Sequence, residues 1–412
     1  MTGLTEITVG FMPLFDSAMI VIAQEKGFAA DEGLFLRLVR ETSWANIRDR
    51  LAVGHFEAAH MLAPMPIASN LALQTLNVDM IVPIALGLGG NAVTISNAVH
   101  DAMATKGPLD ILKPASVGAA LKSVITDRAQ TGARPLRFAV VHFFSGHNYE
   151  LRYWLAGCGI SPDRDVEIVV VPPPLMADAL AMGTIDGYCV GEPWNSLSVV
   201  RGTGHIATVK AAIWQTSPEK VLGVEARWAS HNMPAVEALV RAVARAAEWC
   251  GNPENHQELA AIMSAPDYLG LDASLPMPAL TGRINTGGGQ VVDVADFLIP
   301  FAKAATFPWQ SHGLWFYSQM VRWGHSAGSA ENQKRAQETF RPDIYRRAVT
   351  PLGYAVPGAN MKVMGALSRA DFVGASRSGL ALGPDGFFDG RIFDPAAVEA
   401  YIADLIAKDR TL

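Results

Sequence analysis

Hydrophobic residues in the first part of the chain form short strand patterns that alternate with amphipathic helical patterns. Asp16 and Ser17 can cap the first helix, and Ser43 can cap the second. The order βαβαβαβ predicts a parallel α/β sheet with crossover helices. The expected strands are 7–12, 34–39, 56–60 and 79–86, and the expected helices are 17–26, 44–53 and 64–77.

A second series of the same kind begins at residue 136. Its expected strands are 136–141, 166–171, 188–191 and 206–208, and its helices are 148–158 and 173–182. Two α/β units joined by extended segments near 95–100 and 218–225 predict two lobes with a ligand cleft between them. We expect residues 1–97 and 222–412 to form lobe 1 with a C-terminal extension, and residues 98–221 to form lobe 2. No internal repeat of 20–50 residues is visible.

The last third of the chain differs in pattern. Residues 236–250 predict a helix with one apolar face, and residues 307–324 form the densest aromatic cluster. A helix that packs Trp315, Met320 and Trp323 onto a lobe is favoured over a partner-binding face.

Composition narrows the functional classes. The 412 residues carry a net charge of −6 and no Lys/Arg run, which argues against direct nucleic-acid binding. Cys158, Cys189 and Cys250 have no metal-ligand spacing and are expected to be buried free thiols. The first residues, MTGLTEITVGFMPLF, carry no export-signal pattern. We expect a cytoplasmic protein, with the removal of a targeting segment as the alternative, because Met1 resembles a native start. The longest apolar stretch is broken by Asp79 and Pro83, and no membrane span is expected.

The sequence lacks the common enzyme signatures. A GxGxxG after a strand, GxxxxGK[ST], GxSxG and HExxH are all absent. The Gly-rich stretches 87–90 and 287–289 do not have the spacing of a phosphate loop. We therefore expect a non-enzyme without catalytic residues, metal or cofactor.

Six residues lie in or beside segments that leave the predicted strands, where α/β sheets bind ligands. Lysine supplies positive charge, histidine and asparagine supply N–H donors, glycine permits close approach, and tryptophan supplies a flat wall or an indole N–H. This set suits a small planar monoanion such as nitrate. A carboxylate repels an anion, so the glutamate is expected to pair with the lysine, orient the histidine or brace a closed state. Spacing alone also allows core packing or a simple turn. The residues are Trp44, Asn91, His147, Gly191, Glu192 and Lys220.

Longer motifs at these positions resemble a known family. They are EKGFAADEGL, SWANIRDRLAVGHFEAAHMLAPMP, RYWLAGCGISPDRDVEIVVVPPPLMADALAMGTIDGYCVGEPWN, SPEK and LWFYSQMVRWG, within residues 5–325. The chain resembles the nitrate-binding proteins of NrtA/NasS type, a branch of the periplasmic-binding-protein superfamily. The resemblance implies the two-lobed type II fold.

The same resemblance places the family's anion contacts on Trp44, His147, Gly191, Glu192 and Lys220. A family glutamine falls on Asn91, whose side chain is shorter by one methylene. The choice among nitrate, nitrite and bicarbonate, which related proteins bind, therefore stays open.

The lack of an export signal makes the chain similar to the soluble sensors of NasS type. That likeness implies a cytoplasmic nitrate/nitrite sensor that controls an ANTAR-domain, RNA-binding antiterminator of nitrate assimilation. The alternative is the solute-binding subunit of an ABC transporter for nitrate, nitrite or bicarbonate. Pyrimidine-synthesis enzymes share the fold, but their CCCFC-like motif is absent.

Overall fold

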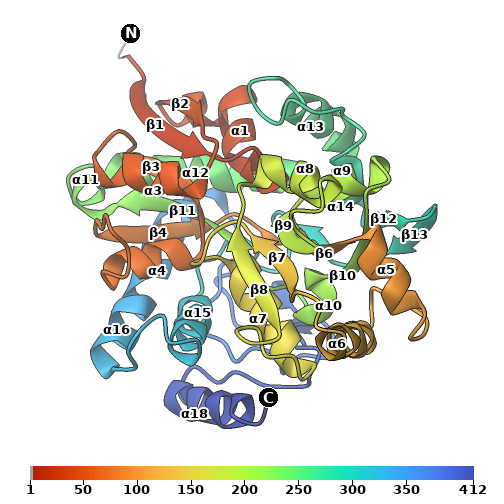
Figure 1. The fold of residues 1–412 in the computed structure, drawn as a ribbon. Helices are drawn as coiled ribbons and strands as arrows, with labels where there is room; N and C mark the ends of the chain where they lie inside the picture. Colours follow the sequence, from red (N-terminus) through yellow and green to blue (C-terminus); the bar gives the residue numbers. More distant parts are fainter. Residues whose placement is uncertain (1–2) are drawn as a thin grey trace.

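The computed structural model describes residues 3–412 and contains two five-stranded sheets, one in each of two lobes (Figure 1). The first sheet has the order β2 (Leu34–Arg40), β1 (Thr5–Phe11), β3 (Ala58–Leu62), β11 (Lys220–Glu225), β4 (Met80–Ala85). The second has the order β10 (Gly204–Val209), β6 (Asn91–Ser96), β9 (Gly187–Gly191), β7 (Leu136–Val140), β8 (Val166–Val170). The two-lobed α/β fold is confirmed.

The prediction of purely parallel sheets is wrong, because each sheet contains one strand that enters from the other lobe. β1 is parallel to β2 and β3, whereas β11 runs antiparallel to β3 and β4. β6 likewise runs antiparallel to β9 and β10. A strand that enters its sheet from the cleft side runs against strands that end there. The first residues of β6 and β11 therefore meet the last residues of β9 and β3.

We expected the chain to pass from one lobe to the other after residues 97 and 221. In the structure, it changes sheets a few residues earlier at both places. β6 belongs wholly to the second sheet and β11 wholly to the first. The two crossing segments, residues 86–90 and 210–219, touch each other: the Gly89 N–H donates to the Ser217 carbonyl at 3.0 Å. Gly89 has φ 77°, and a Cβ there would collide with the Phe297 carbonyl, so the crossing requires glycine.

The helices around the sheets largely follow the expected pattern. Ser43 accepts a hydrogen bond from the Asn46 N–H at 3.2 Å, the predicted cap. Ser17 makes no capping hydrogen bond. α4 ends at Asn70 instead of residue 77, because the Asn70 side chain bonds both backbone groups of Met80. The predicted helices are α1 (Ala18–Glu25), α3 (Trp44–Ala52), α4 (Pro64–Asn70), α7 (Gly146–Gly157), η2 (Pro173–Leu175) with α8 (Met176–Ala181), and α12 (Met233–Gly251).

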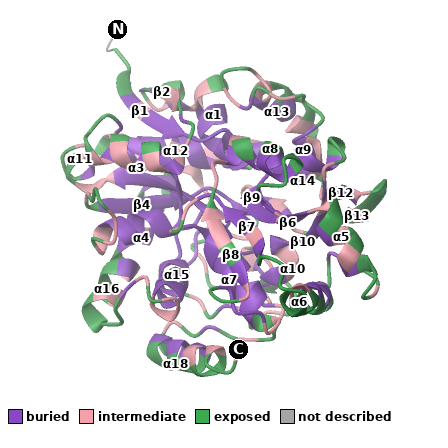
Figure 2. Ribbon diagram, viewed as in Figure 1, coloured by how far each residue is buried: buried purple, intermediate pink, exposed green. Residues whose placement is uncertain are grey.

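The remaining elements complete the fold, and Figure 2 shows exposed residues mainly on outer helices and loops such as α6, α13 and α16. The helices are η1 (Phe15–Ser17), α2 (Phe28–Asp31), α5 (Asn97–Ala104), α6 (Pro114–Gln130), α9 (Trp194–Val200), α10 (Lys210–Ile213), α11 (Ala226–His231), η3 (Pro253–Asn255), α13 (His256–Met263), α14 (Met277–Thr281), α15 (Gln310–Arg322), α16 (Ala330–Thr339), α17 (Pro342–Val349), η4 (Thr350–Leu352) and α18 (Val398–Asp409). The short strands are β5 (Leu88–Gly89), β12 (Arg283–Gly287), β13 (Gln290–Asp293), β14 (Leu298–Ile299), β15 (Asp371–Phe372) and β16 (Ala381–Leu382).

The C-terminal third packs on both lobes and not on lobe 1 alone. α17 packs on α12, and α15 packs on both α4 and α7. Tyr153 of α7 donates its hydroxyl hydrogen to Asp389 at 2.9 Å. Trp315 and Met320 are buried and Trp323 is partly buried, as the helix interpretation predicts.

Two bulk expectations can be compared with the described residues. Cys158, Cys189 and Cys250 are free thiols, of which Cys158 is only partly buried. No helix within residues 3–412 combines the length and apolar character that a membrane crossing requires.

Replacing Trp315 by alanine should lower the free energy of unfolding by about 3–5 kcal/mol, because the indole is fully buried against Trp214 and Phe316. Urea unfolding measures the change. Phe372→Ala is the control, since that ring is 74% exposed and should change the free energy by less than about 0.5 kcal/mol. Equal effects would contradict the packing role of α15.

Candidate functional site

The six residues singled out in the sequence lie where the lobes meet. Asn91 is the first residue of β6 and pairs in register with Gly191, the last residue of β9. Lys220 opens β11 opposite Leu62, the last residue of β3. Trp44 and His147 lie in the first turns of α3 and α7. All six side chains or backbones are buried.

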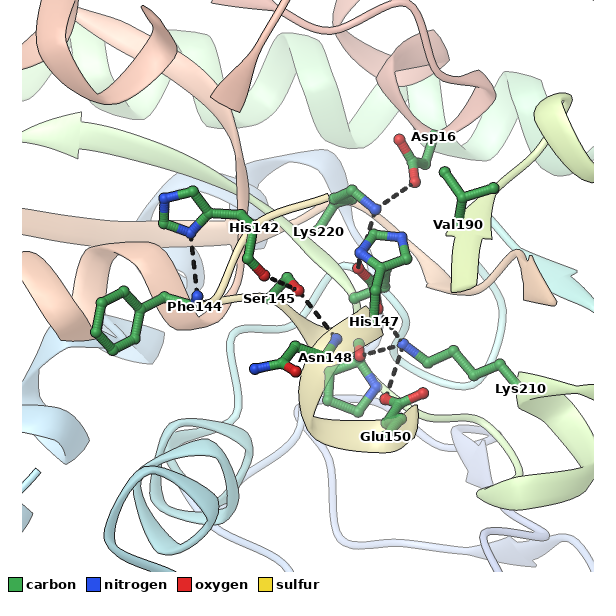
Figure 3. Close-up of polar contacts among 12 residues, drawn as sticks. Asp16, His142, Phe144, Ser145, His147, Asn148, Glu150, Val190, Lys210 and Lys220 are labelled. Carbon is green, nitrogen blue, oxygen red and sulfur yellow. Dashed lines mark hydrogen bonds and ion pairs between the residues drawn. The ribbon is translucent and has the colours of Figure 1, made fainter. Parts of the chain in front are cut away.

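Lys220 is the centre of a buried ion-pair network (Figure 3). Its Nζ lies 2.8 Å from Asp16 Oδ2 and 3.0 Å from Glu219 Oε1. It also lies 5.8 Å from the centroid of the Trp44 ring. The lysine is fully buried, so the two carboxylates compensate its desolvation.

Asp16 was expected to cap a helix and instead belongs to this network. Its Oδ1 lies 3.0 Å from His60 Nε2. Burial opposes ionisation of Asp16, but Lys220 and His60 outweigh it and lower the pKa to about 2. His60 Nδ1 accepts the Met12 N–H at 3.4 Å, which leaves the proton on Nε2, facing Asp16. The position of Asp16 just beyond β1 is the signal that could have identified it.

A second lysine extends the network towards lobe 2. Lys210 lies 2.9 Å from Glu150 Oε1 and also contacts Glu219, so that Glu219 bridges both lysines. Burial raises the pKa of Glu150, although Lys210 opposes the shift. A Cβ on Gly146 would collide with the Glu219 carboxylate, which explains the glycine at the start of α7.

Four of the six expected residues carry buried polar atoms without a hydrogen-bond partner in residues 3–412. These atoms are Trp44 Nε1, both amide atoms of Asn91, both ring nitrogens of His147 and Glu192 Oε1. His147 Nδ1 lies 3.3 Å from Glu219 Oε1. Burial lowers the pKa of His147 to about 3, so the imidazole is neutral at pH 7. Buried polar groups normally have partners, which makes this set suited to a ligand.

Gly191 brings the backbone close to the same atoms. A Cβ there would lie 3.2 Å from Asn91 Oδ1 and 3.3 Å from Asp16 Oδ2. The position therefore has no room for a side chain unless those groups move.

Glu192 does not pair with Lys220, so the first of its three expected roles is wrong. Asp16 and Glu219 form ion pairs with Lys220 instead. Glu192 Oε2 accepts the Ser196 N–H at 3.1 Å. Burial raises the pKa of Glu192 to about 7, and the hydrogen bonds from Ser196 and Asn195 only partly oppose this.

The lobes are closed over this cluster. The Trp194 indole N–H donates to the Pro13 carbonyl at 3.0 Å, and the Phe15 N–H donates to the Glu192 carbonyl at 2.9 Å. Beside Pro13, loops of both lobes line an open cavity of about 460 Å³. Its lining residues are Pro13, Arg40, Glu41, Thr42, Ser43, Pro172, Pro174 and Leu175. Ser43, the N-cap of α3, lines this cavity and directly precedes Trp44 in the chain.

Metal binding has no support in the part of the chain that the structure describes. No group of three or more His, Cys, Asp or Glu residues there has an arrangement that could hold a metal ion. Three of the clustered acids, Asp16, Glu150 and Glu219, instead contact lysines.

The sequence and fold are similar to those of known proteins. The NMT1-like family matches residues 2–264, which is more than half of the chain. The chain belongs to this family. The nitrate/nitrite binding protein NrtA of Synechococcus elongatus is 34% identical over 408 residues, covering 97% of this chain and 86% of that protein. The NrtA side of the resemblance is therefore confirmed, while closeness to NasS stays a prediction.

Two further relatives broaden the comparison. The crystal structure of the periplasmic nitrate-binding protein NrtA from Synechocystis superposes with a TM-score of 0.86 at 27% identity, covering 98% of both chains. The nitrate import ATP-binding protein NrtC of Synechocystis is 32% identical over 85% of this chain and 51% of its own length. NrtA is a binding protein, which is consistent with the expectation of a non-enzyme.

His147→Gln should change how stability depends on pH. The folded protein keeps His147 neutral down to about pH 3, whereas the unfolded chain protonates it near pH 6.5. The free energy of unfolding of the wild type therefore decreases as the pH is lowered below 6.5. Between pH 7.5 and pH 5, it should decrease by about 2 kcal/mol more than that of His147→Gln. Chemical denaturation measures it. A constant difference would contradict a neutral buried imidazole, and the exposed His231→Gln serves as control.

Proposed function

We propose that this protein binds nitrate or nitrite between its two lobes. The observation that carries the proposal is the set of unpartnered donors, Trp44 Nε1, the Asn91 amide and a His147 ring nitrogen, buried beside Lys220. The relationship to nitrate-binding NrtA supports the same ligand class.

The chemistry of the site suits a small planar monoanion. Such an anion is a weak acceptor with diffuse charge, so it needs several donors at once in a dry site. A hydrogen bond to a charged group contributes about 1.5–3 kcal/mol. Three such bonds approach the roughly 8 kcal/mol that corresponds to micromolar affinity, before the ordering cost. Lys220 supplies charge nearby, and Trp44 supplies a flat face.

We further propose that the bound anion is delivered to an ABC importer. The relatives that support this role are a periplasmic nitrate-binding protein and a nitrate import ATP-binding protein. The sensor role, with a cytoplasmic location and an ANTAR-domain antiterminator as partner, rests on the NasS resemblance alone. Importer delivery is therefore the favoured role of the two.

Trp44→Phe should weaken nitrate binding about 10- to 100-fold, because it removes an unpartnered donor and keeps an aromatic wall. Isothermal titration calorimetry with nitrate, nitrite and bicarbonate measures both affinity and selectivity. Trp154→Phe is the matched control: its indole N–H already bonds the Pro114 carbonyl at 2.8 Å, so anion affinity should not change. Unchanged nitrate binding in Trp44→Phe would remove Trp44 from the site.

Deleting the gene separates the two roles. A transport role predicts that nitrate uptake at micromolar concentrations is lost while millimolar nitrate still induces assimilation genes. A sensor role predicts retained uptake together with transcription that no longer responds to nitrate. Uptake of labelled nitrate and transcript levels are measured in the same strain, with the gene restored as control.

A further inference from the structure

The buried cluster holds more acid than base. Four carboxyls, those of Asp16, Glu150, Glu192 and Glu219, accompany two lysines, Lys210 and Lys220. Burial lowers the pKa of the two histidines of the cluster, His60 and His147. A fully ionised cluster would already be negative before an anion entered. Adding another negative charge to a dry site is strongly unfavourable unless a carboxyl is neutral.

Three of the four carboxyls are ion-paired. Asp16 contacts Lys220 and His60, Glu219 contacts both lysines, and Glu150 lies 2.9 Å from Lys210. Glu192 takes part in no ion pair among residues 3–412, although its side chain is buried. Its Oε2 is held by the Ser196 N–H, and its Oε1 has no partner. Glu192 is therefore the carboxyl of this cluster that no cation of residues 3–412 contacts, whereas Glu150, whose pKa burial raises to about 8, still contacts Lys210.

The elements packed against Glu192 and α9 supply no cation to compensate it. Their titratable groups are each engaged elsewhere. Asp16 follows β1 and bonds Lys220; Tyr188 of β9 donates to Ser198; Asp178 of α8 pairs with Arg201; His205 of β10 stacks on His100; Arg283 of β12 pairs with Asp293. Lys210 and Lys220, at the crossing segment, already form ion pairs with the other three carboxyls of the cluster.

We propose that Glu192 is a specificity-determining residue that binds the anion as the neutral acid, with its Oε1–H donated to the ligand. This inference rests on the proposed function. Nitrate and nitrite carry no hydrogen, so a Glu192 carboxylate could only repel them. When Glu192 is ionised in the free protein, one proton moves from solvent to Oε1 for each anion bound.

The same group discriminates between classes of oxyanion. A hydrogen-bearing anion such as bicarbonate can donate its own O–H to an ionised Glu192. A proton-free anion cannot. Raising the pH should therefore weaken the binding of nitrate and nitrite relative to bicarbonate. Burial, which raises the pKa of Glu192 to about 7, sets the pH range in which the change occurs.

Calorimetric titration of nitrate into the full chain from pH 5.5 to 8.5, in buffers of different ionisation enthalpy, tests the proposal. Wild-type affinity should fall about tenfold per pH unit above pH 7. Proton uptake should rise towards one per anion at pH 8.5 and be near zero at pH 5.5. Glu192→Gln keeps an N–H donor but cannot titrate, so its affinity should vary less than threefold and its proton uptake should stay near zero.

The outcomes are distinguishable. Exposed Glu254→Gln is the matched control and should follow the wild type. Nitrate binding without proton uptake in the wild type would overturn this inference alone, as would wild-type proton uptake retained in Glu192→Gln. Absence of nitrate binding in both proteins at every pH would overturn the proposed function itself.

Discussion

The pairing of Lys220 with Asp16 and Glu219 is the interaction on which the site depends. A fully buried ammonium is stable only with compensating charge, and the two carboxylates come from different parts of the chain. Asp16 lies just beyond β1 of lobe 1, whereas Glu219 lies on a crossing segment and also binds Lys210. The network therefore joins the first sheet, the crossing segment and α7 into one electrostatic unit.

The residues that hold the lobes together differ from those that would bind an anion. The ion pairs satisfy both lysines without any ligand. The atoms left without partners are mostly neutral donors, those of Trp44, Asn91 and His147. A diffuse monoanion would then be recognised mainly by hydrogen bonds, with the lysine charge already shared. Such a site would favour singly charged anions, because Asp16 and Glu219 would repel multiply charged ones more strongly.

Sequence patterns predict much of this fold and less of its electrostatics. Alternating strand and helix patterns locate β1, β2, β3 and α12 closely, because one buried face determines each element. The direction of β6 and β11 was not predicted, because a hydrophobic pattern does not show which way a strand runs. Both strands enter their sheets from the other lobe and are therefore antiparallel to their neighbours. Motifs single out Trp44, Asn91, His147 and Lys220. His60 and Glu150 become visible only through contacts far apart in sequence, and Asp16 was assigned to a helix cap although it follows β1.

The antiparallel entry of β6 and β11 has a mechanical consequence. Asn91 and Lys220 are the first residues after the two crossing segments, so each belongs to a strand through which one lobe is joined to the other. Trp44 and His147 lie instead at the starts of helices that belong to opposite lobes. Separation of the lobes would therefore move the indole and the imidazole apart.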